Sequence, residues 1–108
     1  MIEIEHQHDS TVLCRPSGDL DLPGSLTLRH VLADILRPGL KVVIDLRHVR
    51  VVDAVGVSAL VGTGRRVRSV GGTARIINTN PRLRCLLRSV GAGQLLAEPF
   101  VTSSPDAA

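Results

Sequence analysis

The chain has 108 residues, which is enough for one domain with a single hydrophobic core and too few for two. Hydrophobic residues make up 44% of it, and no apolar run approaches the roughly 20 residues that span a bilayer. The first residues, MIEIE, are acidic and alternating, unlike the basic and apolar start of a signal peptide. We therefore expect a cytoplasmic protein without membrane insertion, with a domain over residues 1–101 and a disordered tail over 102–108.

Thirteen basic residues, nearly all of them arginine, and ten acidic residues give a formal net charge of +3. Excess arginine can indicate nucleic acid binding, but Phe100 is the only aromatic residue, so bases would have no platform for stacking. The arginines are spread over several elements, and no helix-turn-helix or zinc-finger spacing is present. A direct nucleic acid partner is therefore not predicted.

Two strands are expected at the start of the chain. Residues 2–7 alternate between apolar and polar side chains, which is the period of a half-buried strand, and Asp9-Ser10 follow as a turn. A second strand begins at Thr11. Residues 16–18 break or bulge this strand before the chain continues as 19–22. The two strands can pair in antiparallel fashion.

Three helices are expected from apolar residues that recur with helical spacing. The first follows Pro23-Gly24-Ser25, the second starts at Asp53 and ends at Gly71-Gly72, and the third follows Asn80-Pro81. Their inward-facing stripes are Leu28, Val31, Leu32, Ile35 and Leu36; Val57, Leu60, Val61, Gly64 and Val67; and Leu83, Leu86, Leu87 and Val90. Gly64 would let the second helix approach the sheet closely.

Residues 41–46, KVVIDL, are nearly continuously apolar, which suits a central strand covered on both faces, with Asp45 at or near its end. Residues 73–77 make a further strand, and residues 47–52 are expected to form a loop. Strands that are separated by single helices run parallel through right-handed crossovers. The predicted fold is therefore α/β, a single domain with one mixed β-sheet, parallel central strands and helices packed on it.

The two cysteines are too few for a disulfide framework and too far apart for a CxxC motif. Cys14 lies in an apolar strand, where a thiol is buried and inert. Cys85 lies opposite the apolar stripe of its helix, and Arg82 and Arg88, three residues away on either side, favour its thiolate. Cys85 is therefore a candidate redox site, and an incidental surface cysteine is the alternative.

No motif of a common enzyme class is present: there is no phosphate-binding P-loop, no Rossmann fingerprint and no supported catalytic triad. His6 and His8 would share one face of a strand, but no third metal ligand is evident. We therefore expect a protein without enzymatic activity, metal or cofactor. Arg65, Arg66 and Arg68 form either a solvated helix face or a contact for an acidic partner.

Asp53 stands where an apolar stretch passes into a helix, in the run DAVGVS. Its carboxylate can accept hydrogen bonds from the free amides of Val55 or Gly56 and meet the positive end of the helix dipole. A plain N-cap explains this residue. The alternative is that Asp53, Gly56 and the exposed helix start form a surface that a partner or an anion recognises.

The order and spacing of several short runs resemble the STAS domain of bacterial anti-sigma factor antagonists. These runs are VVIDL at 42–46, DAVGV at 53–57, Gly71-Gly72 and VGAGQLL at 90–96. In addition, GDLD at 18–21 stands at the position where the family carries an early turn of glycine and an acidic residue. The resemblance covers about residues 2–97. It implies a bacterial protein that binds an anti-sigma factor, often a kinase of the histidine-kinase-like ATPase group, and so releases a sigma factor.

In that family the kinase phosphorylates a serine in the turn, and phosphate there abolishes binding. Asp53 and Gly56 match the family's turn, but Ala54 and Val55 occupy the two serine positions, and neither accepts phosphate. Ser58 is a displaced candidate acceptor, which helix geometry is expected to point away from Val55. The resemblance places the partner-binding residues at Asp53, Ala54, Val55, Gly56, Val57 and Ser58.

Two other functions remain open at this point. STAS subunits also regulate or stabilise ABC-type membrane transporter complexes, and they would use the same helix face. Some STAS domains are reported to bind nucleotides, although no stacking aromatic residue or phosphate loop supports that function here.

Overall fold

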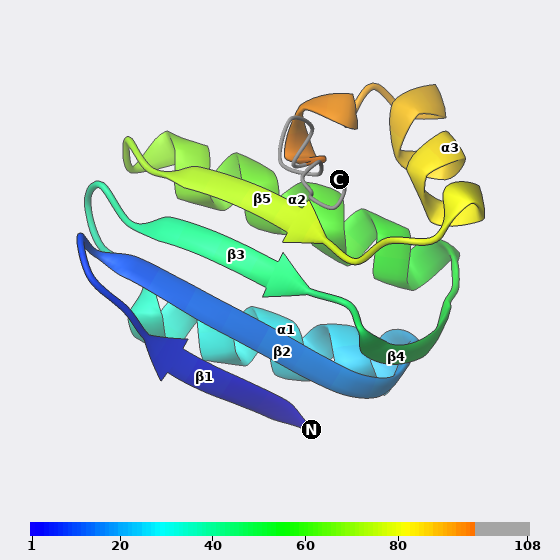
Figure 1. Ribbon diagram of the computed structural model, residues 1–108, viewed down its shortest axis with the longest axis horizontal. Coiled ribbons are helices and arrows are strands. Elements are labelled where there is room, and N and C mark those ends of the chain that lie inside the picture. Colours follow the sequence, from blue (N-terminus) through cyan, green and yellow to red (C-terminus); the bar gives the residue numbers. More distant parts are fainter. Residues whose placement is uncertain (97–108) are drawn as a thin grey trace, which may run out of the picture.

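The computed structural model describes residues 1–96 (Figure 1). The strands of this part are β1 (Ile2–His6), β2 (Thr11–Leu20), β3 (Lys41–Asp45), β4 (His48–Val52) and β5 (Thr73–Ile77). The helices are α1 (Leu22–Ile35), α2 (Ala54–Ser69) and α3 (Pro81–Ser89), followed by a short 3-10 helix at Gly93–Leu95. The end of the predicted domain, 97–101, and the predicted tail, 102–108, lie outside the described residues.

The strands form one mixed sheet in the order β1-β2-β3-β5 (Figure 1). β1 pairs with β2 in antiparallel register, and β3 is parallel to both of its neighbours. The predicted mixed sheet with parallel central strands and an antiparallel opening pair is confirmed.

Residues 48–52 are a strand, so the prediction of a loop over 47–52 was wrong. β2 has ten residues, and its first half pairs with β3 while its second half, from Ser17 to Leu20, pairs with β4. The register shifts between Gly18 and Asp19, and Gly18 has a positive φ of 85°. β2 therefore runs on through the predicted break, and the irregularity lies within its pairing with β4, where the register passes over Arg50.

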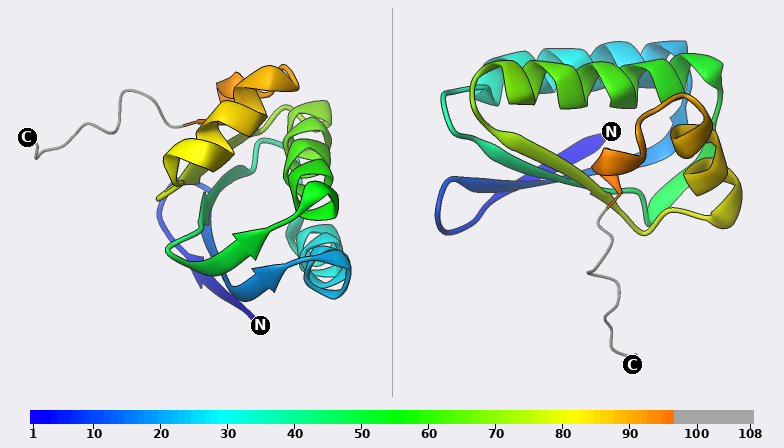
Figure 2. Two further views of the ribbon diagram at one scale, coloured as in Figure 1. Left: turned by 90° about the vertical axis from the view of Figure 1, so that its right-hand side faces the viewer. Right: turned by 90° about the horizontal axis from the view of Figure 1, so that it is seen from above.

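Both long helices, α1 and α2, lie side by side on the same face of the sheet, and α3 lies beyond the β5 edge (Figure 2). Val42 and Ile44 point to the helices and are buried, whereas Val43 points to the other face and is half-buried. The expectation that this central strand is covered on both faces was therefore wrong. Asp45 is the last residue of β3, as predicted.

Helix α1 begins at Leu22 and so includes Pro23, Gly24 and Ser25, which were expected to precede it, because Asp21 caps it. The Asp21 Oδ1 atom accepts a hydrogen bond from the Gly24 amide at 3.1 Å, and Pro23 occupies the first turn, where its missing amide costs nothing. The predicted inner stripe is confirmed, with Leu28 and Leu32 buried at its centre.

The predicted stripe of α2 is also confirmed except for what Gly64 meets, whereas α3 departs from its predicted stripe. In α2, Leu60, Gly64 and Val67 are buried as expected, but a side chain at Gly64 would meet Leu95 of the 3-10 helix rather than the sheet, its Cβ lying 2.5 Å from the nearer Cδ atom. In α3, Leu83 and Leu87 are buried, while Leu86 and Val90 are exposed. A short helix at the edge of a sheet buries only a narrow stripe, which explains this difference.

The first strand ends at His6, and His8 lies in the connection to β2, so these two histidines do not share a strand face. Asp9 and Ser10 have positive φ values of 58° and 59°, which confirms the predicted turn. Within residues 1–96, no three histidine, cysteine or acidic side chains gather as metal ligands would.

Candidate functional site

Asp53 directly follows β4 and caps helix α2. Its Oδ1 atom accepts a hydrogen bond from the Gly56 amide at 2.9 Å, and its own amide donates to the Leu20 carbonyl at 3.4 Å. The predicted N-cap, with Gly56 as the donor, is therefore confirmed. The carboxylate also lies at the positive end of the helix dipole, where an acidic side chain favours the start of a helix.

Gly56 is buried, and its lack of a side chain is what lets α2 start against the sheet. A Cβ atom at this position would collide with the Leu20 carbonyl oxygen and lie 2.9 Å from Cγ1 of Val52. Val57 is half-buried and packs against the core. These two predicted partner-binding residues therefore support the turn from within rather than form its surface.

The surface of the turn is made by the other four predicted residues. Asp53, Ala54, Val55 and Ser58 are all exposed. Val55 and Ser58 line the same groove, so the expectation that they point in different directions was wrong. Residues three apart share a helix face, which is the physical reason.

A second turn of the same design stands beside the first. Asp21 caps α1 through Gly24, and a Cβ atom at Gly24 would lie 2.6 Å from the Asp19 carbonyl oxygen. Leu20 pairs with Val52 at the ends of two parallel strands, so both helices begin at the same edge of the sheet. The sequence signal for this pair is the repeated spacing Asp-x-x-Gly directly after an apolar residue.

Between the two helices runs a groove of about 240 Å³, which we call the α1–α2 groove. It is lined by Leu22, Ser25, Leu26 and Arg29 of α1 and by Val55, Ser58, Ala59, Gly62, Thr63 and Arg66 of α2. Leu22, Leu26 and Val55 are 56%, 45% and 43% exposed. Sequence reasoning missed the α1 side, although Leu22 and Leu26 form an apolar i, i+4 pair outside the core stripe.

Two polar features accompany this apolar surface. The Ser25 hydroxyl is buried, the residue being only 2% exposed, and it has no hydrogen-bond partner among residues 1–96. Arg29 and Arg66 line the groove, and no acidic residue does. Of the predicted arginine cluster, only Arg66 faces the groove, while Arg65 and Arg68 are exposed elsewhere on the helix.

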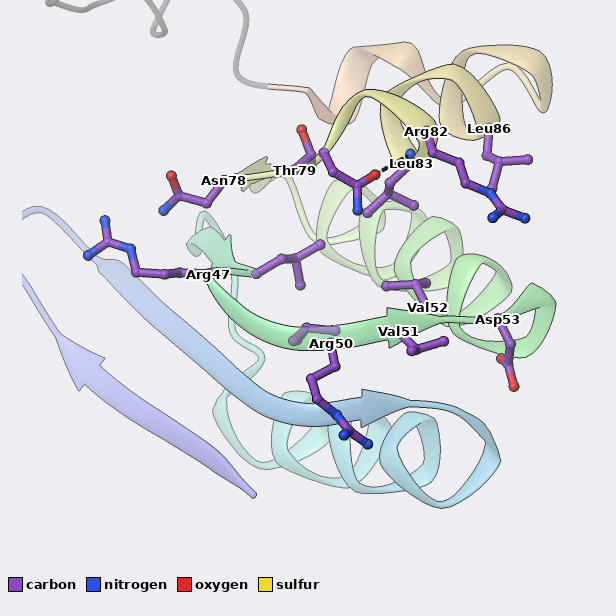
Figure 3. A pocket seen from close by; sticks show the side chains of 13 residues that line it. Arg47, Arg50, Val51, Val52, Asp53, Asn78, Thr79, Arg82, Leu83 and Leu86 are labelled. Carbon is purple, nitrogen blue, oxygen red and sulfur yellow. Dashed lines mark hydrogen bonds between the residues drawn. The ribbon is translucent and has the colours of Figure 1, made fainter.

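A second hollow, of about 570 Å³, lies on the other side of the Asp53 turn, between β4 and α3 (Figure 3). Arg47, Arg50 and Arg82 line it, but their guanidinium groups point in different directions (Figure 3). Arg50 is already engaged, since its Nη2 atom lies 3.2 Å from Oδ1 of Asp19. The arrangement therefore does not concentrate positive charge at one point.

Asp45 forms a buried polar network beside this second hollow. Its Oδ1 atom accepts hydrogen bonds from Asn78 Nδ2 at 2.7 Å and from the Arg47 amide at 2.9 Å, and its Oδ2 atom lies 3.5 Å from Nε of Arg15. Burial alone would raise the pKa of Asp45, but these hydrogen bonds and the nearby positive charges outweigh it and lower the pKa below its ordinary value of 3.8. Asp45 therefore ties the β3 end to the start of the β5–α3 connection.

The two cysteines lie in opposite environments, as predicted: Cys14 is buried and Cys85 is exposed. Burial raises the pKa of the Cys14 thiol to about 11, which leaves almost no thiolate at neutral pH. A redox role for Cys85 remains a prediction.

Native protein treated with a thiol reagent such as DTNB at pH 8 is expected to release one equivalent of thionitrobenzoate rapidly, from Cys85. The second equivalent, from Cys14, should appear only with unfolding, because its sulfur is both buried and protonated. The Cys85→Ser variant should lose the rapid phase and keep the slow one. Rapid release of two equivalents from the native protein would contradict the buried state of Cys14.

No helix within residues 1–96 combines the length and the apolar character that crossing a membrane requires.

The sequence and the fold match those of known proteins. The model of the STAS domain family matches residues 2–107. The anti-sigma-B factor antagonist of Bacillus subtilis (strain 168) is 26% identical over 90 residues, which cover 83% of each chain. The phosphorylated form of SpoIIAA, a Bacillus cell fate determinant, aligns with a TM-score of 0.73 at 19% identity over 99% of this chain and 96% of that one.

An anti-sigma factor antagonist from Mycobacterium paratuberculosis aligns with a TM-score of 0.66 at 22% identity, over 99% of this chain and 89% of that one. The solved structures share the fold, and the family model spans nearly the whole sequence. The protein therefore belongs to the STAS domain family.

Proposed function

We propose that this protein is an anti-sigma factor antagonist that binds an anti-sigma factor of the histidine-kinase-like ATPase type and so releases a sigma factor. The observation that carries the proposal is the exposed surface at the start of α2, where Asp53, Ala54, Val55 and Ser58 surround a rigid capped turn. The similarity to named anti-sigma factor antagonists supports it. These exposed residues can contact a partner and form no recognisable catalytic arrangement, which suits a binding protein rather than an enzyme.

Regulation of this binding would differ from regulation by phosphorylation of a serine in the turn. Ala54 and Val55 occupy the outermost positions of the turn, and neither carries a hydroxyl group. A phosphate would bring about −1.5 to −2 charges to the docking surface, and this repulsion is not available at Val55. We therefore infer that binding does not depend on phosphorylation of the turn.

Substitution of Val55 by glutamate is expected to weaken binding to the cognate anti-sigma factor by about a hundredfold or more. The change removes apolar contact at the centre of the surface and places a charge where the family's phosphate would be. The partner is identified by titrating each purified kinase-type anti-sigma factor of the source bacterium into the unmodified protein in a calorimeter. The same titration then gives the dissociation constant for each variant.

The matched control is Val90→Glu, the same change at a valine that is 56% exposed and lines neither hollow. It should bind as the unmodified protein does. Equal weakening by both variants would show that added charge, not the turn, is responsible. Binding of a transporter subunit instead of every anti-sigma factor would replace the proposed function with the transporter alternative.

The absence of a serine switch has its own measurement. After incubation with the cognate kinase and ATP, the intact mass of the protein should be unchanged. An added phosphate that disappears in Ser58→Ala would contradict this expectation and identify Ser58 as the acceptor.

A further inference from the structure

The α1–α2 groove has three properties that together describe what fits into it. The first is an apolar opening formed by Leu22, Leu26 and Val55, each more than two-fifths exposed. Exposed apolar side chains from separate elements that line one groove mark a docking surface more often than scattered ones do. The groove of about 240 Å³ has room for one large side chain rather than for a helix.

The second property is an unpartnered hydroxyl on a residue that lines the groove. Ser25 is 2% exposed, and its Oγ atom makes no hydrogen bond within the described residues. A buried polar group without a partner is costly, and most such groups in folded proteins have one. A ligand that enters the groove with a polar backbone group would supply the missing hydrogen bond.

The third property is the sign of the charge around the opening. Arg29 and Arg66 line the groove from opposite helices, and no acidic side chain does. The N-termini of both helices at this edge already carry the capping carboxylates of Asp21 and Asp53, so the positive charge of the groove comes from the two arginines. The surroundings of the apolar opening therefore favour a carboxylate.

We propose that the α1–α2 groove is the specificity pocket of the docking surface and receives an apolar side chain of the anti-sigma factor that is followed by an acidic residue. The apolar side chain lies between Leu22, Leu26 and Val55, the partner's backbone hydrogen-bonds to Ser25 Oγ, and the carboxylate meets Arg66 or Arg29. This inference rests on the proposed function and extends it from the α2 turn to helix α1.

Gly62 allows the groove to be filled without disturbing the fold. No atom lies within 4 Å of a Cβ atom built at Gly62, so a side chain there extends into open space, and leaving glycine improves helix propensity. Gly62→Leu is expected to weaken anti-sigma factor binding by about 10- to 100-fold, the value of one buried large apolar side chain. Gly62→Ala adds only one methyl group to the lining and should weaken binding much less than Gly62→Leu, so the pair separates filling of the groove from loss of the glycine itself.

The charge requirement is tested by a matched pair on one helix. Arg66→Glu should weaken binding by about tenfold, with a dependence on salt, because Arg66 lines the groove. Arg65→Glu makes the same change in net charge at an exposed neighbour outside the groove and should have little effect. If the two variants weaken anti-sigma factor binding equally, the effect comes from the net charge of the protein and not from the position of Arg66. That result would overturn this part of the proposal.

A small probe separates this inference from the proposed function. In two-dimensional NMR spectra, N-acetyl-Leu-Glu amide at millimolar concentration should shift the amide signals of Ser25, Leu26, Val55 and Gly62 in the unmodified protein. These shifts should be absent in Gly62→Leu and weaker with N-acetyl-Leu-Lys amide.

The outcomes are distinct. If the anti-sigma factor binds the unmodified protein and Gly62→Leu equally well, the groove proposal is wrong while the proposed function stands. If no anti-sigma factor binds but the dipeptide shifts the groove signals, the proposed function falls and the groove chemistry is supported. Dipeptide shifts that are spread over the surface, or that are as strong with lysine, would overturn the assigned ligand chemistry.

Discussion

Replacement of Gly56 by alanine is expected to lower the free energy of unfolding by about 2–3 kcal/mol, although only one methyl group is added. The new Cβ atom would collide with the Leu20 carbonyl oxygen, which belongs to the strand end beneath the helix and cannot rotate away as a side chain can. Either α2 lifts from the sheet or the end of β2 shifts. Both movements displace the Asp53 turn, so binding of the anti-sigma factor should weaken as well.

Urea denaturation followed by circular dichroism measures the stability change, and Gly62→Ala is the matched control on the same helix. A Cβ atom at Gly62 meets nothing within 4 Å, so this substitution should raise stability by up to about 1 kcal/mol through helix propensity. The two glycine substitutions should therefore move the denaturation midpoint in opposite directions. Destabilisation by both to the same extent would contradict the role assigned to the Leu20 carbonyl.

Sequence periodicity predicted most of the fold because the core obeys it. Leu28 and Leu32 are buried where the helical spacing places them, and Asp45 ends β3 as expected. Asp53 was predicted as an N-cap, and its hydrogen bond to the Gly56 amide confirms it. Such features depend on neighbours along the chain, which a sequence displays directly.

The features that the sequence did not predict depend on pairing between distant segments. β4 is held by its pairing with the second half of β2, a segment about 30 residues away along the chain, and its short run HVRVV carried only a weak alternating signal. The exposure of Leu86 follows from the edge position of α3, which no local pattern encodes.

The candidate site divides in the same way into a local part that the sequence predicted and a part that depends on distant pairing. The turn from Asp53 to Ser58 could be found by its local spacing, whereas the α1 side of the groove could not. Leu22 and Leu26 become part of one surface with Val55 only because Leu20 and Val52 pair at the end of two parallel strands. The repeated Asp-x-x-Gly spacing at Asp21 and Asp53 is the one sequence feature that hints at this neighbourhood.

Substitution of Asp45 by alanine is expected to lower the free energy of unfolding by about 3 kcal/mol or more. The change leaves the Asn78 side-chain amide and the Arg47 backbone amide without their acceptor, and it removes the more deeply buried of the two carboxylates that pair with Arg15. The control is Asp19→Ala, which breaks an ion pair with the 75% exposed Arg50 and should cost less than about 1 kcal/mol. A similar cost for both would show that burial of the Asp45 network contributes little.

The pH dependence identifies the carboxylate itself as the stabilising group. The pKa of Asp45 is lower in the folded protein than its ordinary value of 3.8, so the folded state favours the charged form. Its contribution is therefore fully present above about pH 5 and is lost as the pH falls through the folded-state pKa.

Asp45→Asn keeps one acceptor oxygen but never carries the charge, so it should be less stable than the unmodified protein at neutral pH. The difference in unfolding free energy between the two proteins should then shrink below pH 3.8, because protonated Asp45 resembles asparagine in charge. If the difference in unfolding free energy stays constant from neutral pH into this acidic range, the stability comes from the hydrogen-bonding geometry alone and not from the ionised carboxylate.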